Sequence, residues 1–532
     1  MSTDAFNACT YLIDRQLERG RAGHPAVTGP AGTLTYAELA RDVSRLAAGL
    51  RAAGLRPEER MVLFASDGPR MLTALLAAMR LGAVPVPVST MYNAEELAAL
   101  LADSRARMLL ATGEFAGTAA KALAQTEGVT DFVAAGDDEP PGLPEGVRLR
   151  RWAALLAEGA RRTGDFLPPY PAGDDFPALW LYTSGTTGTP KAAIHRHAAL
   201  RHVCETYADQ VLGLTADDIC WSASKLFFAY GLGVGALFPL AAGATTVLLQ
   251  QRSTPDAAAE VLAAHRPTVV AAGPTFIAAL LAAELPAEVF APVRAVTSAG
   301  EPLPAELYRR FHDRFGVEVL DGLGSTEMLH IFLSNRPGAV RPGTTGVPVP
   351  GYALQLVDAA GAPVTEPDAP GRLLVSGPSA ALGYWCRDAT TRRVFRGEWL
   401  DTGDTYSRSA DGYYTCLGRS SDLIKAGGIW VSPAEVEARL MRHPGVLQAA
   451  VVAAPDADRL EKPVACVVPQ PGAEPTEAEL IAYCREGLAH FKCPRKVLLL
   501  AELPITPTGK IRRVALRERV RDVLLPSPSA TA

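Results

Sequence analysis

A loop of small hydroxylic and glycine residues has the composition of an anion-binding site. Residues 181–191 read Leu-Tyr-Thr-Ser-Gly-Thr-Thr-Gly-Thr-Pro-Lys, and the apolar segment 178–181 predicts a buried strand that leads into the loop. Backbone N–H groups and hydroxyls in such a loop can surround an anion, and Lys191 adds a positive charge. The loop therefore predicts a triphosphate site, although Ser/Thr/Gly clusters are also typical of solvated loops.

The loop is not a Walker A motif. That motif places four residues between its glycines and ends in Gly-Lys-Ser/Thr. Here Gly185 and Gly188 are separated by two residues, and Pro190 precedes Lys191. The phosphate-binding interpretation therefore does not imply a P-loop fold.

The whole composition is that of a large globular protein. The chain has 532 residues, of which 48% are hydrophobic and 20% are charged, and this balance is ordinary for a protein with a large core. The length predicts about three or four structural units. With a net charge of −5 and no long basic run, nothing in the sequence predicts a nucleic-acid partner or an anionic membrane partner.

Neither the cysteines nor the first residues indicate export. The eight cysteines form no CxxC and no Cys/His pairs, which argues against a disulfide framework and against structural zinc. The first 15 residues include Asp4 and Asp14 and contain no apolar core. Four glycines and Pro239 interrupt the uncharged stretch 226–251, so it predicts a buried helix followed by a strand rather than a membrane span. We expect a cytoplasmic protein.

The larger part of the chain alternates strand-like runs with helical segments. Thr35 to Glu38 form a capping box that predicts a helix ending near Gly54. Short apolar runs predict strands at 62–64, 84–88, 108–111, 132–134, 245–249, 269–272, 295–298 and 317–320. Strands that alternate with Ala- and Leu-rich helices imply parallel sheets and an α/β architecture.

Two changes of composition divide the rest of the chain. After Pro342, short alternating runs rich in Gly and Pro predict a β-rich portion, a distorted barrel. After Gly418, strands at 423–425 and 446–453 and helices at 433–442 and 477–488 predict a compact α+β unit. The predicted domains are an N-terminal domain of α/β subdomains plus the barrel (1–418), a hinge (419–425), a small mobile C-terminal domain (426–525) and a disordered tail (526–532).

Five segments that could carry chemistry follow one another along the chain. They are 183–191, 321–327 (Asp-Gly-Leu-Gly-Ser-Thr-Glu), 399–404 (Trp-Leu-Asp-Thr-Gly-Asp), 418–428 and 504–510 (Pro-Ile-Thr-Pro-Thr-Gly-Lys). Together they resemble the adenylate-forming superfamily of acyl-CoA synthetases, peptide-synthetase adenylation domains and luciferases, over essentially the whole chain. Segments 225–233, 298–301 and 325–335 resemble benzoate–CoA ligases, which make aryl-CoA thioesters from an acid, ATP and CoA.

The resemblance implies that the acid is first joined to AMP. A carboxylate oxygen must attack the α-phosphate of ATP and expel pyrophosphate, so two anions meet and positive charge and a metal are needed. By the resemblance, Glu327 beside Thr326 binds Mg²⁺, a hard cation that favours oxygen ligands, and Lys510 is the catalytic lysine. The loop that holds the leaving phosphates comprises Thr183, Ser184, Gly185, Thr186, Thr187, Gly188 and Lys191.

The same resemblance places the nucleotide. Asp404 is expected to accept the ribose hydroxyls, and Arg419 to contact the ribose or a phosphate. Many relatives carry an aromatic residue at the position of Leu323, so adenine would rest on an aliphatic surface here. The walls of the adenine slot are Ser298, Ala299, Gly300, Glu301 and Pro302 on one side and Asp321, Gly322, Leu323 and Gly324 on the other.

Thioester formation requires a second pose of the C-terminal domain. One face of the domain cannot serve both steps, so members of the superfamily rotate it between two poses. Residues 419–422 resemble the hinge of the superfamily. At the position of Ser421, many relatives carry Asp or Lys. By the resemblance, the segment that approaches the pantetheine of CoA is Gly427, Gly428, Ile429 and Trp430.

Two further segments match the family's acid pocket. One segment supplies Phe228, Ala229, Tyr230 and Gly231, and the other supplies Leu329, His330 and Ile331. By the resemblance, Lys425 faces the active site in one pose of the C-terminal domain. An aromatic ring fits a flat, apolar slot. Tyr230 is expected to form the floor, and His330 to lie near the carboxylate or the ring edge. The pocket predicts benzoate or a lightly substituted or heteroaromatic acid rather than a fatty acid.

Taken singly, these residues also have ordinary interpretations. Glu327 can begin a helix, Asp404 can occupy a turn, and Arg419 and Lys510 can be solvated charges. A lone His or Tyr in an apolar stretch is more often core, and His330 gains weight as a site residue only from its closeness to Glu327.

Other functions and partners follow from the same motifs. An adenylation enzyme that loads a carrier-protein thiol shares the first half-reaction, and a luciferase-like oxygenase shares it too, although the aryl-pocket match disfavours the oxygenase. A non-catalytic ligand-binding homologue is disfavoured because Lys191, Glu327, Asp404 and Lys510 are intact. The family also includes dimers and enzymes switched by lysine acetylation, so a homodimer and a lysine acetyltransferase acting on Lys510 are compatible with the resemblance.

Overall fold

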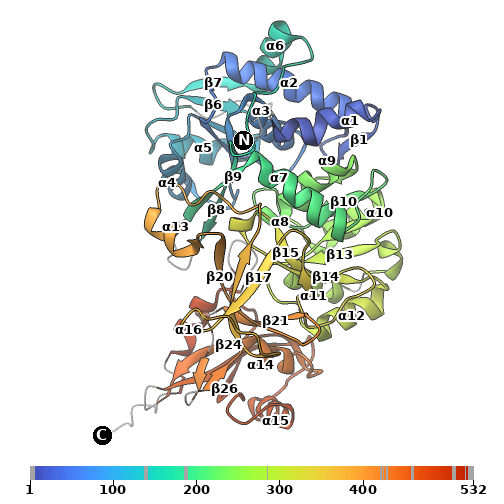
Figure 1. Cartoon of the computed structure of the whole chain (residues 1–532), viewed down its shortest axis with the longest axis vertical. Helices are drawn as coiled ribbons and strands as arrows, with labels where there is room; N and C mark the ends of the chain where they lie inside the picture. Colours follow the sequence, from blue (N-terminus) through green and yellow to red (C-terminus); the bar gives the residue numbers. More distant parts are fainter. Residues whose placement is uncertain are drawn as a thin grey trace.

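The chain folds into four units: from top to bottom of Figure 1 lie the first α/β unit, then the second α/β unit and the antiparallel sheet at similar heights, and then the C-terminal unit. The computed structural model describes residues 6–136, 142–184, 190–283, 285–419, 422, 424–426, 429–456, 460–505, 511–521 and 523–524. Two α/β units come first, an antiparallel sheet follows, and an α+β unit ends the described chain.

The first unit is a five-stranded parallel sheet with helices on both faces. Its strands, in spatial order, are β4 (Val84–Pro87), β3 (Arg60–Phe64), β5 (Met108–Ala111), β6 (Asp131–Ala134) and β7 (Arg148–Arg151). Its helices are α2 (Tyr36–Ala52), α3 (Pro69–Leu81), α4 (Ala94–Ser104), α5 (Ala116–Leu123) and α6 (Trp152–Thr163). Thr35 and Glu38 form the predicted capping box at the start of α2, which confirms the predicted helix.

The second unit is a nine-stranded sheet whose central strands are parallel. In spatial order the strands are β16 (Val347–Pro348), β15 (Ile331–Ser334), β14 (Val319–Gly324), β13 (Ala295–Ser298), β12 (Val269–Ala271), β10 (Ile219–Ser222), β11 (Thr245–Val247), β1 (Pro25–Thr28) and β2 (Leu34–Thr35). The antiparallel edge strands β15, β16 and β2 differ from the parallel pairing predicted. They arise where connections without a crossover helix join the strands.

Helices of the second unit lie among and outside the strands. They are α7 (His197–Val203), α8 (Ala229–Leu232), α9 (Phe238–Ala242), α10 (Pro255–His265), α11 (Pro274–Ala282) and α12 (Ala305–Phe315). The stretch 226–251 folds into α8, a π-helical turn, α9 and β11, as predicted. No helix in the described ranges is long and apolar enough to cross a membrane.

The two α/β units share one core. Met61 and Leu63 of β3 pack into the same cluster as α2, α3 and residues of β10 and β12, whereas Val62 and Phe64 pack against α4 and α5. On the far side of the second sheet, α10, α11 and α12 cover Val270 and its neighbours. This alternation produces five layers, helix–sheet–helix–sheet–helix, and it follows from the period of two along each strand.

An antiparallel sheet links these layers to the C-terminal unit. It is the β-rich portion expected after Pro342, and in Figure 1 β17 and β20 lie above the C-terminal unit, at about the height of β14 of the second unit. Its strands are β17 (Ala353–Val357), β18 (Gly371–Ser376), β19 (Phe395–Arg396), β20 (Trp399–Arg408) and β21 (Tyr414–Arg419), and helix α13 (Asp388–Val394) precedes β19. A separate hairpin, β8 (Pro177–Ser184) and β9 (Pro190–Arg196), confirms the buried strand predicted before the phosphate loop.

The C-terminal unit has its own two-sided core. Three strands, β24 (Val446–Pro455), β25 (Glu461–Pro469) and β26 (Lys496–Leu499), form a sheet, and β22 (Ile424–Ala426) pairs with β23 (Ile429–Val431). Helices α14 (Pro433–Leu440) and α15 (Glu477–Gly487) cover one face of the sheet, and α16 (Arg513–Val520) covers the other. The predicted α+β composition is therefore correct.

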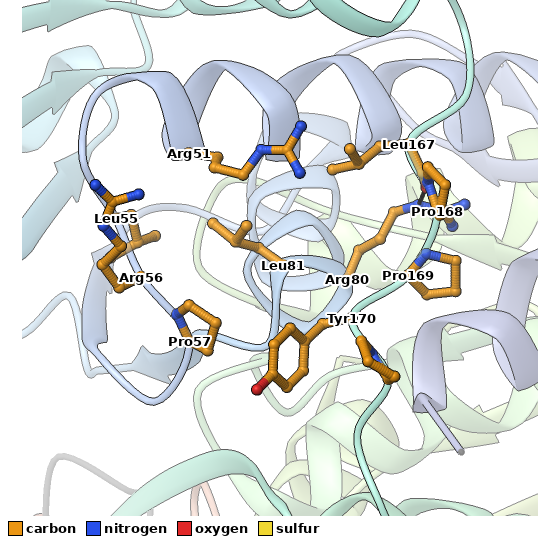
Figure 2. Close-up of a pocket in the computed structure, with 11 residues that line it drawn as sticks. Arg51, Leu55, Arg56, Pro57, Arg80, Leu81, Leu167, Pro168, Pro169 and Tyr170 are labelled. Carbon is orange, nitrogen blue, oxygen red and sulfur yellow. Dashed lines mark hydrogen bonds between the residues drawn. The ribbon is translucent and has the colours of Figure 1, made fainter. Parts of the chain in front are cut away.

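One hollow lies away from all predicted site residues. It measures about 290 Å³ and opens between α2, α3 and the proline-rich segment 167–171 (Figure 2). Behind it, buried Arg80 pairs with Asp14 at 2.9 Å and donates to the carbonyl of Leu167 at 2.6 Å. These contacts tie the N-terminal segment to the first unit, and the hollow is distinct from the predicted acid pocket.

Candidate active site

The predicted site segments gather at the carboxyl ends of parallel strands. The order of strands reverses at β10, which has β11 on one side and β12 on the other. In open α/β sheets the crevice beside such a reversal is the usual ligand site. The acid-pocket segment follows β10 directly, and the two predicted adenine walls follow β13 and lie on β14, with Ser298 opposite Asp321 in the register.

The adenine segments carry buried polar groups. Ser298 is fully buried, and its hydroxyl has no hydrogen-bond partner among the described residues. Burial raises the pKa of Asp321 well above its ordinary value, because desolvation disfavours the charged carboxylate. Gly300 has a φ of +97°, a conformation that suits glycine. The predicted contacts with adenine remain predictions.

A tight turn separates Glu327, the predicted metal ligand, from His330, a predicted residue of the acid pocket. Ser325 caps a short 3₁₀ turn, Thr326–Met328, which carries Glu327. Leu329 follows with a φ of +65°, and the N–H of His330 donates to the carbonyl of Met328 at 2.8 Å. A non-glycine residue in such a γ-turn is strained and persists only where the surroundings hold it. Strain of this kind is concentrated at functional sites.

Tyr384 joins the two charged residues at the predicted phosphate end. Its hydroxyl donates to Glu327 Oε1 at 2.6 Å, and Lys191 Nζ lies 4.2 Å from the centre of its ring. Burial, and then the Glu327 carboxylate, raises the pKa of Tyr384 far above its ordinary value, so the hydroxyl stays protonated. Partial burial lowers the pKa of Lys191, while the Glu327 charge acts in the opposite direction. The predicted metal ligand and the predicted phosphate lysine therefore share one cluster.

Asp404 and Arg419 form a second charged pair. They lie opposite each other on β20 and β21, and Arg419 Nε is 3.0 Å from Asp404 Oδ1. Arg419 also donates to the carbonyl of Thr402 at 2.9 Å. The Asp404 charge is the main cause of a raised pKa of Arg419, and the Glu327 charge contributes to it. Arg419 therefore experiences the charge of both predicted site carboxylates, Asp404 and Glu327.

The two segments predicted to form the acid pocket are in contact with each other. The Tyr230 hydroxyl lies 2.7 Å from both the carbonyl oxygen and Oγ1 of Thr297, and His330 Nε2 lies 3.3 Å from the Tyr230 carbonyl. Rings of Tyr207, Tyr230 and Phe238 surround His330, and burial lowers the pKa of His330 to about 3. This imidazole is therefore uncharged at neutral pH.

Two glycines of the acid-pocket segment lie very close to neighbouring atoms. A Cβ on Gly231 would lie 2.2 Å from the carbonyl oxygen of Lys225, and a Cβ on Gly233 would lie 2.2 Å from the His330 ring. Any side chain at either position would displace the acid-pocket segment. Glycine at these positions is thus required by packing.

Asp67 anchors the start of the acid-pocket segment. Both of its carboxylate oxygens accept the N–H of Leu226, at 3.2 and 3.3 Å. Burial raises the pKa of Asp67 to about 6, although the nearby Lys225 charge lowers it. Lys225 Nζ donates to the carbonyls of Leu249 and Gln251 at 2.5 and 2.6 Å. These contacts hold the segment between the two α/β units.

Several predicted residues cannot be placed in this site. Gly185, Thr186, Thr187, Gly188, Ser421, Gly427, Gly428 and Lys510 lie outside the described residues. Only the backbone is described for Ser184 in β8 and for Lys425, Ile429 and Trp430, with Lys425 opposite Trp430 in the β22–β23 register. Thr183 lies opposite Lys191 in the β8–β9 hairpin.

Some of the residues that hold these side chains and segments in place were not predicted. They include Tyr384, Thr297 and Asp67. A Gly-Tyr-Trp sequence at 383–385 was the only available signal for Tyr384, because an aromatic pair after a glycine in a β-rich segment is unusual. Trp385 packs against Trp180 of β8 with ring centres 4.8 Å apart. Thr297 and Asp67 carry no signal that distinguishes them from ordinary strand and loop residues.

This five-layered fold, with the Glu327 cluster, the aromatic rings around His330 and a C-terminal unit, defines an enzyme of the AMP-binding type. The family model described as AMP-binding enzyme matches residues 13–385, and the AMP-binding enzyme C-terminal domain matches residues 435–510. The chain belongs to this family of adenylate-forming enzymes, so the predicted superfamily and fold class are confirmed.

Among individual proteins, benzoate–CoA ligases are close relatives. The chain is 43% identical to a benzoate–CoA ligase of Thauera aromatica, covering 97% of this chain and 96% of that protein. The crystal structure of a benzoate CoA ligase from Burkholderia xenovorans matches with a TM-score of 0.87 and 40% identity, over 96% of this chain and 100% of that one. The anthranilate CoA ligase AuaEII in complex with anthranoyl-AMP matches with a TM-score of 0.90 and 34% identity, over 97% of each chain.

Proposed function

We propose that this protein is an AMP-forming acid–thiol ligase. It would convert benzoate, or a small substituted or heteroaromatic carboxylate, with ATP and CoA into the aryl-CoA thioester, AMP and pyrophosphate. The juxtaposition of the Glu327–Tyr384–Lys191 cluster with the pocket around His330 supports this function. The similarity to benzoate–CoA ligase along nearly the whole chain supports the same substrate class.

Each charged group has a distinct part in the proposed adenylation. A carboxylate oxygen of the acid forms a bond to the α-phosphorus, and the bond to pyrophosphate breaks. Lys191 and Arg419 supply positive charge around these anions, and Asp404 would accept the ribose hydroxyls. Lys510 would stabilise the charge that develops on the reacting oxygens.

Glu327 fits a magnesium ion that arrives with the nucleotide. The described residues contain no cluster of three or more His, Cys, Asp or Glu side chains able to hold a metal. Mg²⁺ is usually held by one or two carboxylates together with substrate phosphates. A single carboxylate oriented by Tyr384 meets that requirement. When bound, the ion neutralises phosphate charge.

The pocket favours an uncharged ring. His330 is neutral and enclosed by aromatic rings, and Tyr230 is held by Thr297, so little in the pocket would accommodate a second charge or a long flexible chain. We therefore propose that benzoate-sized acids are turned over and that octanoate and longer acids are not. A panel of aryl and alkyl acids, assayed with ATP and CoA for AMP release, tests this. A preference for octanoate over benzoate would contradict the assignment.

The thiol acceptor and the second half-reaction are part of the proposal. The C-terminal unit would rotate about residues 419–425, with Ser421 at the hinge, and bring the segment 427–430 to the pantetheine of CoA. A carrier-protein thiol is the alternative acceptor, since it shares the first half-reaction. Competition between free CoA and a phosphopantetheinyl carrier protein separates the two.

Two partners and a compartment complete the proposal. A lysine acetyltransferase would acetylate Lys510 and so remove the charge needed for adenylation. The protein would form a homodimer. It would act in the cytoplasm, where ATP and CoA are available. Mass spectrometry after acetyltransferase treatment, with adenylation measured in parallel, tests the modification. Unchanged activity of the acetylated protein would count against it.

A further inference from the structure

The carboxylate of Glu301 connects the second α/β unit to the C-terminal unit. Its Oε1 accepts the backbone N–H of Ile511 at 3.0 Å, and its Oε2 accepts the hydroxyl of Thr275 at 2.9 Å. Thr275 lies in α11, and Glu301 follows β13, so both belong to the second α/β unit. One oxygen is therefore held by its own unit, and the other reaches across to the C-terminal unit.

Ile511 is well placed to transmit this contact. It directly follows Lys510 in the sequence. Ile511 packs on the core formed by β24, β25 and α16, and its backbone pairs with Ile505 in an isolated bridge. Wherever the C-terminal unit moves, Ile511 moves with it.

The same unit is also tied to the hinge. Arg513 of α16 donates to Glu437 at 2.7 Å and to the carbonyl of Val451 at 2.9 Å. Arg517, one turn further on, pairs with Asp422 in the hinge segment. The contact at Ile511 is therefore coupled through α16 to the segment about which rotation is proposed.

We infer that Glu301, oriented by Thr275, is a positioning residue that latches the C-terminal unit in the pose used for adenylation. This inference rests on the proposed function. The carboxylate makes a charge-assisted hydrogen bond, which is stronger than a neutral one. A single bond of this kind can still break in every turnover, so the latch would release when the unit rotates for thioester formation.

The two half-reactions test the latch directly. In Glu301→Ala we expect adenylate formation from benzoate and saturating ATP to slow by about tenfold or more, and thioester formation from saturating benzoyl-AMP and CoA to slow much less. Thr275→Val should slow adenylation less than Glu301→Ala does. Thr275→Ser keeps the hydroxyl and should retain the wild-type rate of adenylation. Glu306→Gln is the matched control, because Glu306 pairs with Arg309 on its own helix, α12, and should alter neither step.

Further readouts separate a latch from other roles. If Glu301 served only the adenine slot, Glu301→Ala would raise the KM for ATP and keep kcat, and that result would overturn the latch. An equal loss in both half-reactions would also overturn it, because it would indicate a general structural defect. In a Lys510→Ala background, Glu301→Ala should cause no further loss of adenylation, and an additive loss contradicts action through Lys510. Failure of the wild-type protein to form any aryl adenylate would instead refute the proposed function.

Discussion

At the scale of single residues, the Glu327 carboxylate depends on a tyrosine 57 positions away. The Tyr384 hydroxyl orients Glu327, and the face of the same ring lies against Lys191. Lys191 and Glu327 carry the charges that the motifs predict, but neither motif indicates what holds these charges in place. A protonated phenol is suited to this task because it donates to a carboxylate without adding charge.

A tyrosine-to-phenylalanine exchange isolates that hydroxyl. In Tyr384→Phe the ring remains beside Lys191, while Glu327 loses its donor, so we expect adenylate formation to fall by about tenfold. Pyrophosphate release in the presence of benzoate, ATP and Mg²⁺ measures this loss. Tyr413→Phe is a matched control, since the Tyr413 hydroxyl donates to the backbone carbonyl of Ala339 at 3.2 Å rather than to a site residue. Equal rates in the two variants would show that Tyr384 does not position Glu327.

At the scale of elements, the loop after β10 is held by the loop after β3. The carboxylate of Asp67 accepts the N–H of Leu226 at the base of the acid-pocket segment, and the two residues are 159 positions apart. Lys225 reaches the carbonyls that follow β11. The position of Phe228 to Tyr230 is thus set by contacts with two neighbouring strand ends, and the short helix α8 that begins at Ala229 contributes little by itself.

The buried Asp67 carboxylate makes a pH-dependent contribution to stability. Its pKa of about 6 in the folded protein exceeds the ordinary value of 3.8, so the folded state binds this proton more tightly than the unfolded state. The contribution of Asp67 to the free energy of unfolding therefore falls as the pH rises from about 4 to 6. Above pH 6 it is lower by about 3 kcal/mol than below pH 4, as the difference in pKa requires. Lys225 is the charged group that faces Asp67 and opposes this effect.

Replacing Asp67 with asparagine checks that sign. The amide of the replacement would have no charge to desolvate, so the free energy of unfolding of Asp67→Asn relative to wild type should rise between about pH 4 and pH 6 and then stay constant. Urea denaturation from about pH 4.5 to pH 8 measures the difference. Asp209→Asn, at an exposed position on the π-helical turn Cys204–Val211, provides the comparison. A difference that is independent of pH would rule out titration of Asp67.

At the scale of the whole molecule, catalysis requires that separate units come together. The two α/β units share a core, and the C-terminal unit has cores of its own. Contacts between the second unit and the C-terminal unit include polar ones, such as that of Glu301 with Ile511. A small polar contact area permits relative motion of units, whereas a large apolar one prevents it.

Loss of the catalytic lysine should separate the two half-reactions. In the proposed mechanism, Lys510→Ala would remove a charge that the C-terminal unit brings to the reacting oxygens in one pose only, so we expect aryl-adenylate formation to fall by about 10²–10³-fold or more. Thioester formation from supplied benzoyl-AMP would use the other proposed pose, so we expect it to be largely intact. Equal losses in both steps would sink the assignment of Lys510.

Much of the local structure could be predicted from the sequence. The capping box at Thr35, the apolar strands of both α/β units and the succession of three kinds of unit rest on interactions within a few residues, and the structure confirms them. The antiparallel β15 and β16 were missed because the turn at Leu329 depends on strain supported by surrounding packing. The π-helical turn Gly233–Leu237 likewise depends on the close approach of Gly233 to His330.

By itself, the sequence determined the family, the order of the units and the residues that carry charge, because motifs and periodicity are local properties of a chain. Only the tertiary structure decided which distant residues hold these side chains and their segments in place. Tyr384 on Glu327, Asp67 on Leu226 and Glu301 on Ile511 join positions 57, 159 and 210 residues apart. Such pairs are created when sheets and units pack, and burial then lowers the pKa of His330 and raises that of Asp321. No local pattern contains that information.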